Sequence, residues 1–160
     1  MKYIRMHQVE AEPMTRGDYN KKRGWEIPAN ENPADEGYLV TYPDGYVSWC
    51  PKAQFEAAGR PCDGMTFGMA IEAMKRGKKV ARKGWRSKGK FLWIKPQVEI
   101  QADWCKDPML KNIAEENGGT ILGVGVICLF TPDSLEKPAI LNGWTPLQCD
   151  MLADDWQIVE

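Results

Sequence analysis

Histidine is almost missing from this sequence, which limits the chemistry available to it. His7 is the only histidine among the 160 residues. A metal site rich in histidine, or a catalytic cysteine–histidine pair deep in the chain, is therefore not expected. No Ser–His–Asp set can be assembled there, and no pair of acids has a spacing that demands catalysis. We expect no catalytic residue, no bound metal and no cofactor.

Long apolar runs and closely spaced cysteines are missing as well. No apolar run approaches the roughly 18 residues that a membrane helix needs, and residues 1–9 lack the apolar stretch of a signal peptide. The five cysteines are odd in number and widely spaced, which favours free cytosolic thiols over disulfides or a zinc knuckle. We expect Cys62, Cys105, Cys128 and Cys149 to be small buried hydrophobes. The sequence predicts a cytoplasmic protein without membrane contact.

Net charge is also small, with 21 basic and 22 acidic residues, which argues against a dedicated duplex-DNA binder. The near-zero total hides two opposite blocks. Residues 63–95 hold ten basic and two acidic side chains, whereas residues 96–160 hold three basic and eleven acidic ones. The blocks either neutralise each other, within the fold or between subunits, or the basic block receives an anion. Charge alone leaves both interpretations open.

The turn-rich stretch from Gly59 to Gly64 predicts a domain boundary at Cys62. Residues 1–62 are expected to form an α+β accessory module. Its predicted elements are a strand near Tyr3, Ile4 and Val9, a helix from Thr15 to Gly24, a β-hairpin around 43–45 and a short helix over 51–58. Residues 63–160 are expected to form a second domain.

In this second domain the helical spacing of apolar residues predicts a helix that is capped by Thr66 and ends at Gly77, and a second one that begins at Asp107. A short helical turn is expected to start at Thr145. The expected strands are 79–82, 91–94, 121–130, 140–141 and 156–159, and the one over 121–130 is interrupted by Gly123 and Gly125. Most connections are too short for parallel crossovers, so we expect an α+β fold with a small antiparallel sheet and short helices.

The connection over residues 83–90 nearly spells a phosphate-binding loop, from Gly84 to Gly89 and Lys90. Phe91 stands where Ser or Thr would hold Mg²⁺, and a strand follows instead of a helix, so nucleotide hydrolysis is not expected. The loop can still hold a phosphate, because residues 75–90 contain nine Lys or Arg and no acid. Trp85 in this polar loop is either a ligand contact or a core residue.

The C-terminal run over residues 143–156 is acidic and aromatic. One interpretation is a capped helical turn in which Trp144 and Trp156 are packing anchors. In the other, Gln148 and Asp150 recognise a base edge or ribose hydroxyls, since a carboxylate accepts hydrogen bonds from both groups. Asp150 is alternatively a salt-bridge partner of the basic block.

Several blocks of residues, taken in order, resemble the phage Thoeris anti-defence protein 2 family. They are residues 65–68, 73–75, 77–85, 88–92, 143–144 and 148–156. The resemblance implies a phage protein of the host cytoplasm that sequesters cyclic ADP-ribose-type signals (glycocyclic ADP-ribose) without cleaving them. It also implies a homotetramer with pockets between subunits and, in some members, a separate pocket for cyclic dinucleotides.

We expect the ligand to be bound by residues of the loop and of the C-terminal run. These residues are Trp85, Arg86, Ser87, Lys88, Phe91, Trp144, Gln148, Asp150, Met151 and Trp156. Family members often carry Asn-Gly after the loop tryptophan, where this chain has Arg86 and Ser87, so the choice of ligand remains open. The alternative functions are a single-stranded nucleic-acid-binding module and an enzyme that degrades the signal.

Overall fold

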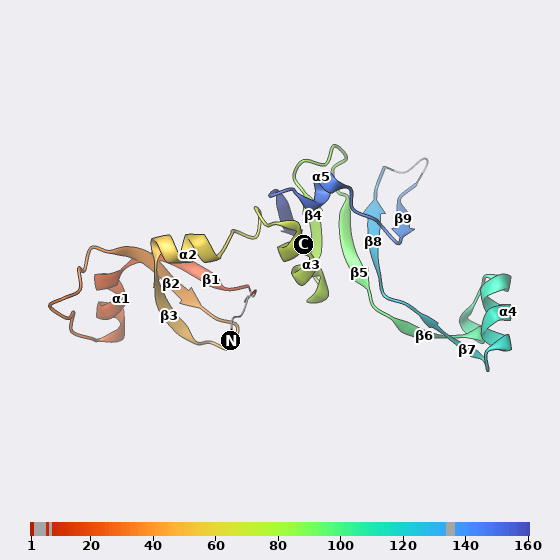
Figure 1. The fold of residues 1–160 in the computed structure, drawn as a ribbon, viewed down its shortest axis with the longest axis horizontal. Coiled ribbons are helices and arrows are strands. Elements are labelled where there is room, and N and C mark those ends of the chain that lie inside the picture. The colour runs from red at the N-terminus through yellow and green to blue at the C-terminus, as the bar shows by residue number, and fades with distance from the viewer. Residues whose placement is uncertain (2–5, 7, 134–136) are drawn as a thin grey trace. The chain divides into compact units, whose positions relative to one another are not determined.

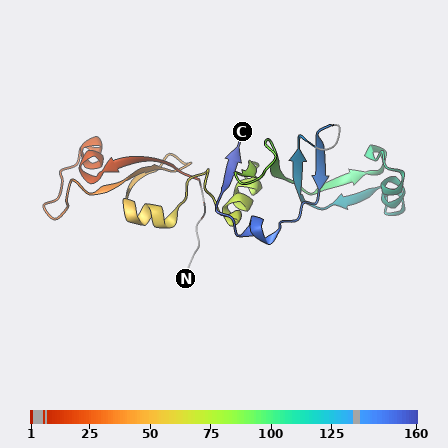
Figure 2. The ribbon, with the colours of Figure 1, turned by 90° about the horizontal axis from the view of Figure 1, so that it is seen from above.

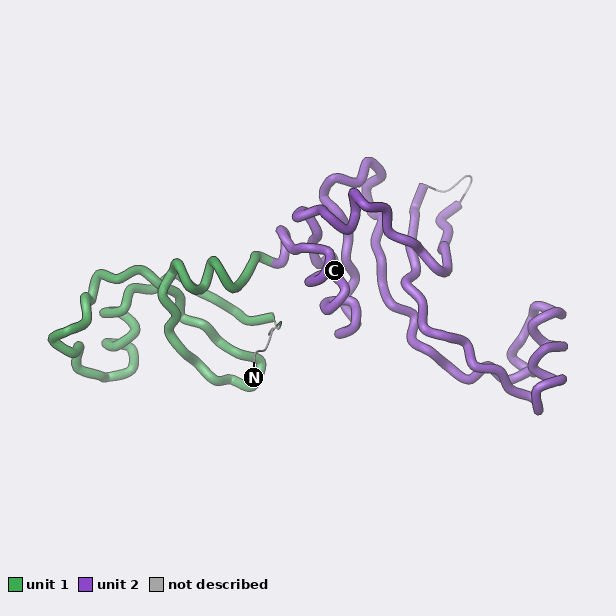
Figure 3. Tube along the Cα trace, in the orientation of Figure 1, with its two compact units in different colours: residues 1–61 green, residues 62–160 purple. Residues whose placement is uncertain are grey.

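The computed structural model of the chain describes residues 1, 6, 8–133 and 137–160. The strand expected at Tyr3 and Ile4 lies outside these residues. The chain folds into two compact units, Met1–Pro61 and Cys62–Glu160 (Figure 3). Both mix short helices with antiparallel strands, which confirms the α+β prediction.

The first unit is a three-stranded antiparallel sheet with two short helices. Its strands, in the order β1-β2-β3, are Glu10–Thr15, Glu36–Thr41 and Val47–Pro51. Its helices are α1 (Arg16–Arg23) and α2 (Lys52–Ala58). The Thr15 hydroxyl accepts the N–H of Asp18, and Gly24 ends α1 with a left-handed φ of 69°, as the sequence predicts. The hairpin β2–β3 is confirmed, whereas β1 was not expected, because its residues include two acids and a proline.

Trp49 on β3 is fixed in place by its neighbours in the first unit. Its Nε1 donates to the carbonyl oxygen of Met14 at 2.9 Å. A Cβ atom added at Gly37 of β2 would lie 2.4 Å from the indole ring, so only glycine leaves room for it there. This indole forms part of the wall of a cavity in the first unit.

The second unit is built on a five-stranded antiparallel sheet in the order β10-β4-β5-β8-β9 (Figure 1). These strands are Trp156–Val159, Lys79–Arg82, Phe91–Lys95, Val126–Thr131 and Ala139–Asn142. Helix α3 (Phe67–Lys75), capped by the Thr66 hydroxyl as predicted, packs its apolar face against this sheet. The core they enclose consists of Met65, Ala70, Met74, Val80, Leu92 and Trp156.

Helix α5 (Gln148–Met151) begins three residues later than the sequence predicts. Leu147 is its N-cap residue, and the Asp150 carboxylate accepts the N–H of Leu147 at 3.2 Å. Thr145 therefore lies outside the helix. The helix is capped by the side chain of Asp150, which lies within it. The sequence Thr145-Pro146, on which the prediction was based, does not indicate this cap.

A two-stranded arm, residues 96–125, continues two strands of the sheet. Strand β5 leads through Pro96 into β6 (Val98–Gln101), and its antiparallel partner β7 (Thr120–Gly123) leads back into β8. A 3₁₀ turn (Ala102–Trp104) and helix α4 (Pro108–Glu116) connect β6 to β7. In Figures 1 and 2 this arm extends beyond the five-stranded sheet.

The single strand expected over residues 121–130 is therefore wrong. It is two strands, β7 and β8, which belong to different sheets. Gly123 and Gly125 flank the break, and Pro96 stands opposite it on the other side of the ribbon. Proline cannot donate to a strand ladder and glycine weakens a strand, so the ladder is interrupted there.

The cysteines follow the prediction only in part. All five have free thiols, and Cys128 is buried. Cys62 and Cys149 are exposed and Cys105 is intermediate, so the prediction of buried thiols is wrong for Cys62 and Cys149. Cys62 lies in the connection between the units and Cys149 on the outer side of α5. Among the described residues, no helix is both long enough and apolar enough to cross a membrane.

Candidate functional site

Arg82, at the end of β4, organises the polar part of the site. Its Nη1 lies 2.9 Å from Oδ1 of Asp150, and its Nε lies 2.8 Å from Oδ1 of Asp155. Oδ2 of Asp155 also accepts the N–H of Gly84 at 2.8 Å, and a Cβ at Gly84 would lie 2.7 Å from this oxygen. The start of the basic loop (residues 83–90) is therefore tied to the C-terminal run by charge-assisted hydrogen bonds.

These contacts shift the ionisation of all three groups. Burial opposes the charge on Asp150, but hydrogen bonds from Arg82, from Trp85 and from the N–H of Leu147 outweigh it and hold its pKa below the ordinary value. The pKa of Asp155 is lowered chiefly by its hydrogen bond to Arg82. The same bonds raise the pKa of Arg82. The network is therefore fully ionised at neutral pH.

Trp85 is held against a cluster of aromatic rings. Its Nε1 donates to Oδ1 of Asp150 at 3.2 Å. Its ring meets those of Trp144 and Trp156 edge to face, with centroids 6.2 and 5.6 Å away, and Phe67 packs against the same two tryptophans. Such pairs fix ring orientation. Trp85 is itself only partly buried, so its indole is accessible at the protein surface.

An open cavity of about 360 Å³ lies beside Trp85, within the roughly 300–1,000 Å³ typical of small-molecule sites. Its walls are β4, the basic loop, the start of β5 and β10. The lining residues are Ala81, Arg82, Lys83, Trp85, Ser87, Lys88, Gly89, Lys90, Phe91, Gln157, Val159 and Glu160. Four cations and two aromatic rings thus face one cavity, which we call the Trp85 cavity.

The basic residues of this cavity differ in how much of their charge is already paired. Arg82 is shared by two carboxylates, and Lys83 lies 2.9 Å from Asp63. Within the described part of the chain, the structure gives Lys88 and Lys90 no ion-pair partner. Just outside the lining, the ammonium of Lys79 lies 5.3 Å from the centroid of the Phe91 ring. Lys88 and Lys90 are therefore the cations most available to an anionic ligand.

The structure brings four of the ten expected site residues together. Trp85, Ser87, Lys88 and Phe91 line the cavity. Arg86 is exposed in the same loop without lining it, and Gln148 and Met151 are exposed on α5. Whether any of the ten contacts a ligand stays a prediction.

Three further expected site residues stand behind Trp85 rather than in the cavity. Asp150 is buried, Trp144 is partly buried, and Trp156 has no exposed surface. The Trp156 Nε1 donates to the carbonyl oxygen of Asp150 at 2.9 Å. Asp150 is engaged by Arg82, Trp85 and the N–H of Leu147, so together with Trp144 and Trp156 it fixes the position of Trp85.

Sequence reasoning missed Gln157 and Val159, which line the cavity from β10. The sequence contained a signal for these two residues, because alternate residues of a strand lie on the same face. Ile158 faces the core, so Gln157 and Val159 lie on the opposite face of β10. Lys90 belongs to the predicted phosphate-binding loop, and Lys83 lies in the same basic run. Gly89 belongs to the glycine pattern of the predicted phosphate-binding loop, whereas Ala81 carries no chemical signal and is found only from the structure.

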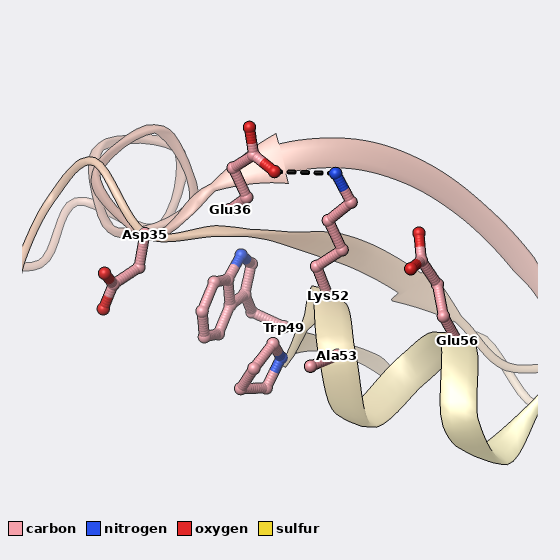
Figure 4. Close-up of a pocket in the computed structure, with 7 residues that line it drawn as sticks. Asp35, Glu36, Trp49, Lys52, Ala53 and Glu56 are labelled. Carbon is pink, nitrogen blue, oxygen red and sulfur yellow. Dashed lines mark hydrogen bonds and ion pairs between the residues drawn. The ribbon is translucent and has the colours of Figure 1, made fainter.

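A second cavity lies within the first unit and has the opposite charge (Figure 4). It has a volume of about 530 Å³ and is lined by Asp35, Glu36, Trp49, Pro51, Lys52, Ala53 and Glu56. The Lys52 ammonium lies 2.7 Å from Glu36, as the dashed line shows, so its charge is already neutralised. Three carboxylates against one paired cation disfavour an anion there, which leaves the Trp85 cavity as the candidate for a phosphate-bearing ligand.

The side chains of the Trp85 cavity offer three kinds of contact to a ligand. Ammonium groups hold phosphates, aromatic rings stack on bases, and Ser87 and Gln157 offer hydrogen bonds to hydroxyls. Across the described residues, no three His, Cys, Asp or Glu side chains are grouped so that they would hold a metal ion.

Comparison with known proteins identifies a family whose domain includes this cavity. A model of the Thoeris anti-defense 2-like domain matches residues 65–159. The chain is also 31% identical over 102 residues to Thoeris anti-defense 2 of Bacillus phage SP01, an alignment that covers 59% of this chain and 94% of the phage protein. All lining residues of the Trp85 cavity except Glu160 fall within the family match, whereas the first unit lies outside it.

Proposed function

The chain belongs to the Thoeris anti-defense 2-like family, and we propose that it binds and sequesters a cyclic ADP-ribose-type nucleotide signal. The family gives it a phage anti-defence role. The finer proposal is that the signal, of the glycocyclic ADP-ribose kind, is held intact in the host cytoplasm and so withheld from the defence system. A cyclic dinucleotide is a second candidate ligand of the same chemical class.

The composition of the Trp85 cavity is the observation that carries this proposal. A cyclic ADP-ribose-type molecule has two phosphates, an adenine and ribose hydroxyls. Lys88 and Lys90, which have no ion-pair partner among the described residues, supply cations for the phosphates. Trp85, held by Asp150, supplies a surface on which the base stacks. Each part of the ligand thus has a matching group in one cavity.

Sequestration without cleavage is supported by the residues that line the cavity. The described lining consists of cations, two aromatic rings, Ser87, Gln157, Glu160 and small or apolar residues, with no histidine or cysteine among them. Lys83 is engaged by Asp63, and the hydroxyl of Ser87 has no base beside it among these side chains. Such a set binds a phosphate ester but does not activate a nucleophile against it.

The same reasoning yields a direct experiment. The protein is mixed with an equimolar cyclic ADP-ribose-type signal, the free signal is measured, and the complex is then denatured by heat. We expect the free signal to be depleted and the intact molecule to be recovered on denaturation. A hydrolysed product at substoichiometric protein identifies an enzyme instead, and absent depletion together with binding of single-stranded oligonucleotide identifies a nucleic-acid-binding module.

Replacing Lys88 with alanine should weaken binding about tenfold at low ionic strength, because it removes one charge-assisted contact to a phosphate, about 1.5 kcal/mol. The loss should shrink as salt is added, since salt screens an exposed charge. Titration calorimetry at two salt concentrations measures both effects. Lys22→Ala, which removes an exposed lysine of the first unit, is the control and should leave affinity unchanged. Equal affinities of Lys88→Ala and the unsubstituted protein at low salt would exclude Lys88 from the site.

We also propose that the protein self-associates, as a homotetramer in the family manner. The oppositely charged segments 63–95 and 96–160 support contacts between copies as well as within one copy. Within one copy, the ion pairs of Arg82 with Asp150 and Asp155 already join the two segments. Light scattering at micromolar concentration measures the particle mass, and a mass of 18.1 kDa would refute self-association.

A further inference from the structure

The acidic cavity of the first unit, which we call the Trp49 cavity, lies outside the part of the chain that the family model matches. It combines two kinds of wall (Figure 4). The apolar residues are Trp49, Pro51 and Ala53, and the acidic ones are Asp35, Glu36 and Glu56. An aliphatic chain that ends in a positive charge matches both kinds, since its stem contacts apolar surface and its head pairs with carboxylates.

Trp49 forms a wall whose position does not depend on a ligand. Its Nε1 is bonded to the carbonyl oxygen of Met14, and its ring lies against Gly37. The guanidinium carbon of Arg16 lies 5.0 Å from the ring centroid. Arg16 is itself fixed, because its Nε donates to Glu31 at 2.6 Å. A binding partner therefore meets a preorganised surface, which lowers the entropic cost of association.

The charges that line the Trp49 cavity do not balance. Lys52 is the one cation among the described lining residues, and its ammonium is paired with Glu36 at 2.7 Å. Glu56 accepts the hydroxyl of Tyr38 at 2.9 Å, a bond that raises the pKa of Tyr38, so this donor stays neutral and leaves the carboxylate charge uncompensated. Asp35 forms no ion pair within the described part of the chain. Two negative charges thus remain, and Lys52 shows that one carboxylate of this cavity already accepts a lysine head.

The side chains at the rim of the cavity lie largely in water. Those of Glu36 and Lys52 are 70% and 50% exposed, and Asp35 and Glu56 are exposed as well. A site for a free small molecule usually buries most of its ligand, which such a rim does not do. A side chain presented by a polypeptide gains further contacts around the rim from the residues on either side of it. The exposure therefore favours a polypeptide partner over a free polyamine.

We propose that the Trp49 cavity receives a lysine or arginine side chain of a partner polypeptide. The aliphatic part of that side chain lies against Trp49 and Pro51, and its charged end points to the carboxylates of Asp35 and Glu56. The first unit thereby acts as a docking module for a basic segment of another protein. The inference concerns a unit outside the family match and does not rest on the proposed function.

Model peptides test the chemistry of the partner on the full chain, with its tryptophans isotope-labelled so that nuclear magnetic resonance follows each indole N–H. Tetralysine or tetraarginine should shift the Trp49 signal saturably, whereas a tetrapeptide of Nε-acetyllysine, which keeps the stem but loses the charge, should not. Spermine, a free polyamine, should bind about tenfold more weakly than the better tetrapeptide, because it lacks the contacts of a backbone. The indole of Trp25, 52% exposed in the same unit, is the control and should not shift.

Three results of this titration would overturn the proposal. In the first, neither basic peptide moves the Trp49 signal. In the second, the acetylated peptide moves it equally, so charge is not what the cavity recognises. In the third, spermine binds as tightly as the peptides, which identifies a polyamine site instead of a docking site for a polypeptide.

Removing the internal cation provides a gain-of-affinity test. Lys52→Met keeps the stem but frees Glu36, so the same peptide should bind about fivefold more tightly, the upper value of one exposed ion pair. Lys22→Met removes the same charge from an exposed position on α1 and should leave the affinity unchanged. If both variants changed the affinity alike, the peptide would respond to net charge only and the cavity would not be its site.

Neutralising the carboxylates provides the opposite test. The double variant Asp35→Asn with Glu56→Gln should weaken peptide binding about tenfold, and glutamine can still accept the Tyr38 hydroxyl. Glu26→Gln, at an exposed position outside the cavity, is the matched control. Equal melting temperatures show that each variant is folded, and undiminished binding by a folded double variant would refute the proposal. Nucleotide binding, measured on the same variants, should be unchanged, so the two cavities are tested separately.

Discussion

Replacing Arg82 with alanine should lower the free energy of unfolding of the second unit by about 3 kcal/mol, the lower end of the range for removing one member of a buried ion pair. The side chains of Arg82 and Asp150 are 17% and 8% exposed, and that of Asp155 is 30% exposed. Without Arg82, Asp150 remains buried and charged with only two neutral donors, Trp85 and the N–H of Leu147. Thermal and denaturant unfolding measure the loss, about 12–24 °C in melting temperature for a domain of this size.

The loss should depend on pH in a defined direction. Because the pKa values of Asp150 and Asp155 are lowered in the folded state, their contribution to stability is present above their unfolded pKa, about 3.9, and is lost as pH falls through the folded values. The difference between Arg82→Ala and the unsubstituted protein should therefore be constant near neutral pH and narrow below about pH 4.

Arg86→Ala is the matched control for this experiment. Arg86 lies in the same part of the chain but is exposed, so its removal should change stability by less than about 0.5 kcal/mol. If Arg82→Ala and Arg86→Ala unfolded alike at neutral pH, the network around Arg82 would not stabilise the fold.

Replacing Trp85 with alanine should weaken binding of the nucleotide by about ten- to a hundredfold, since stacking of one base on an aromatic ring is worth about 1–3 kcal/mol. The structure adds a second expectation. Trp85 packs on Trp144 and Trp156 and donates to Asp150, so the same change should also lower the melting temperature. Calorimetric affinity and thermal unfolding, measured on one preparation, separate the two effects.

Trp85→Phe distinguishes a stacking surface from a structural anchor. Phenylalanine keeps a ring for the base but removes the Nε1 hydrogen bond to Asp150, so we expect affinity near that of the unsubstituted protein and a stability loss of about 1 kcal/mol. Trp25→Ala, in the first unit, should leave affinity unchanged. Unchanged affinity in a well-folded Trp85→Ala protein would remove Trp85 from the site.

Local signals in the sequence predicted much of this fold. Thr15, Thr66 and Asp107 each accept backbone N–H groups at the first turn of a helix, as their positions indicate. The β2–β3 hairpin and strands β4 and β10 also follow from short patterns of residues. These features depend on a few neighbouring residues, so one sequence is enough to find them.

Features that depend on distant residues could not be predicted in the same way. The apolar run over residues 121–130 does not indicate that its two halves pair with different strands. Strand β7 pairs with β6 and strand β8 pairs with β5, and both partners lie elsewhere in the sequence. Asp150 had two open interpretations, and only the structure shows it within reach of Arg82, 68 positions away. The basic loop could be predicted because its charges are adjacent in the sequence. The β10 residues that form the opposite wall of the Trp85 cavity are about 70 positions away in the sequence, so their place in the cavity could not be predicted.

The edge-to-face arrangement of Trp85, Trp144 and Trp156 also gives the protein a built-in optical signal. Indoles held at fixed angles and centroid separations of 5.6–6.3 Å form a chiral array, which contributes to the near-ultraviolet circular dichroism spectrum. That spectrum reports fixed tertiary packing, whereas the far-ultraviolet spectrum reports backbone structure. Trp85 alone of the three lines the cavity. A base that stacks on it would change the near-ultraviolet bands and leave the far-ultraviolet ones in place, so occupancy can be followed without a label.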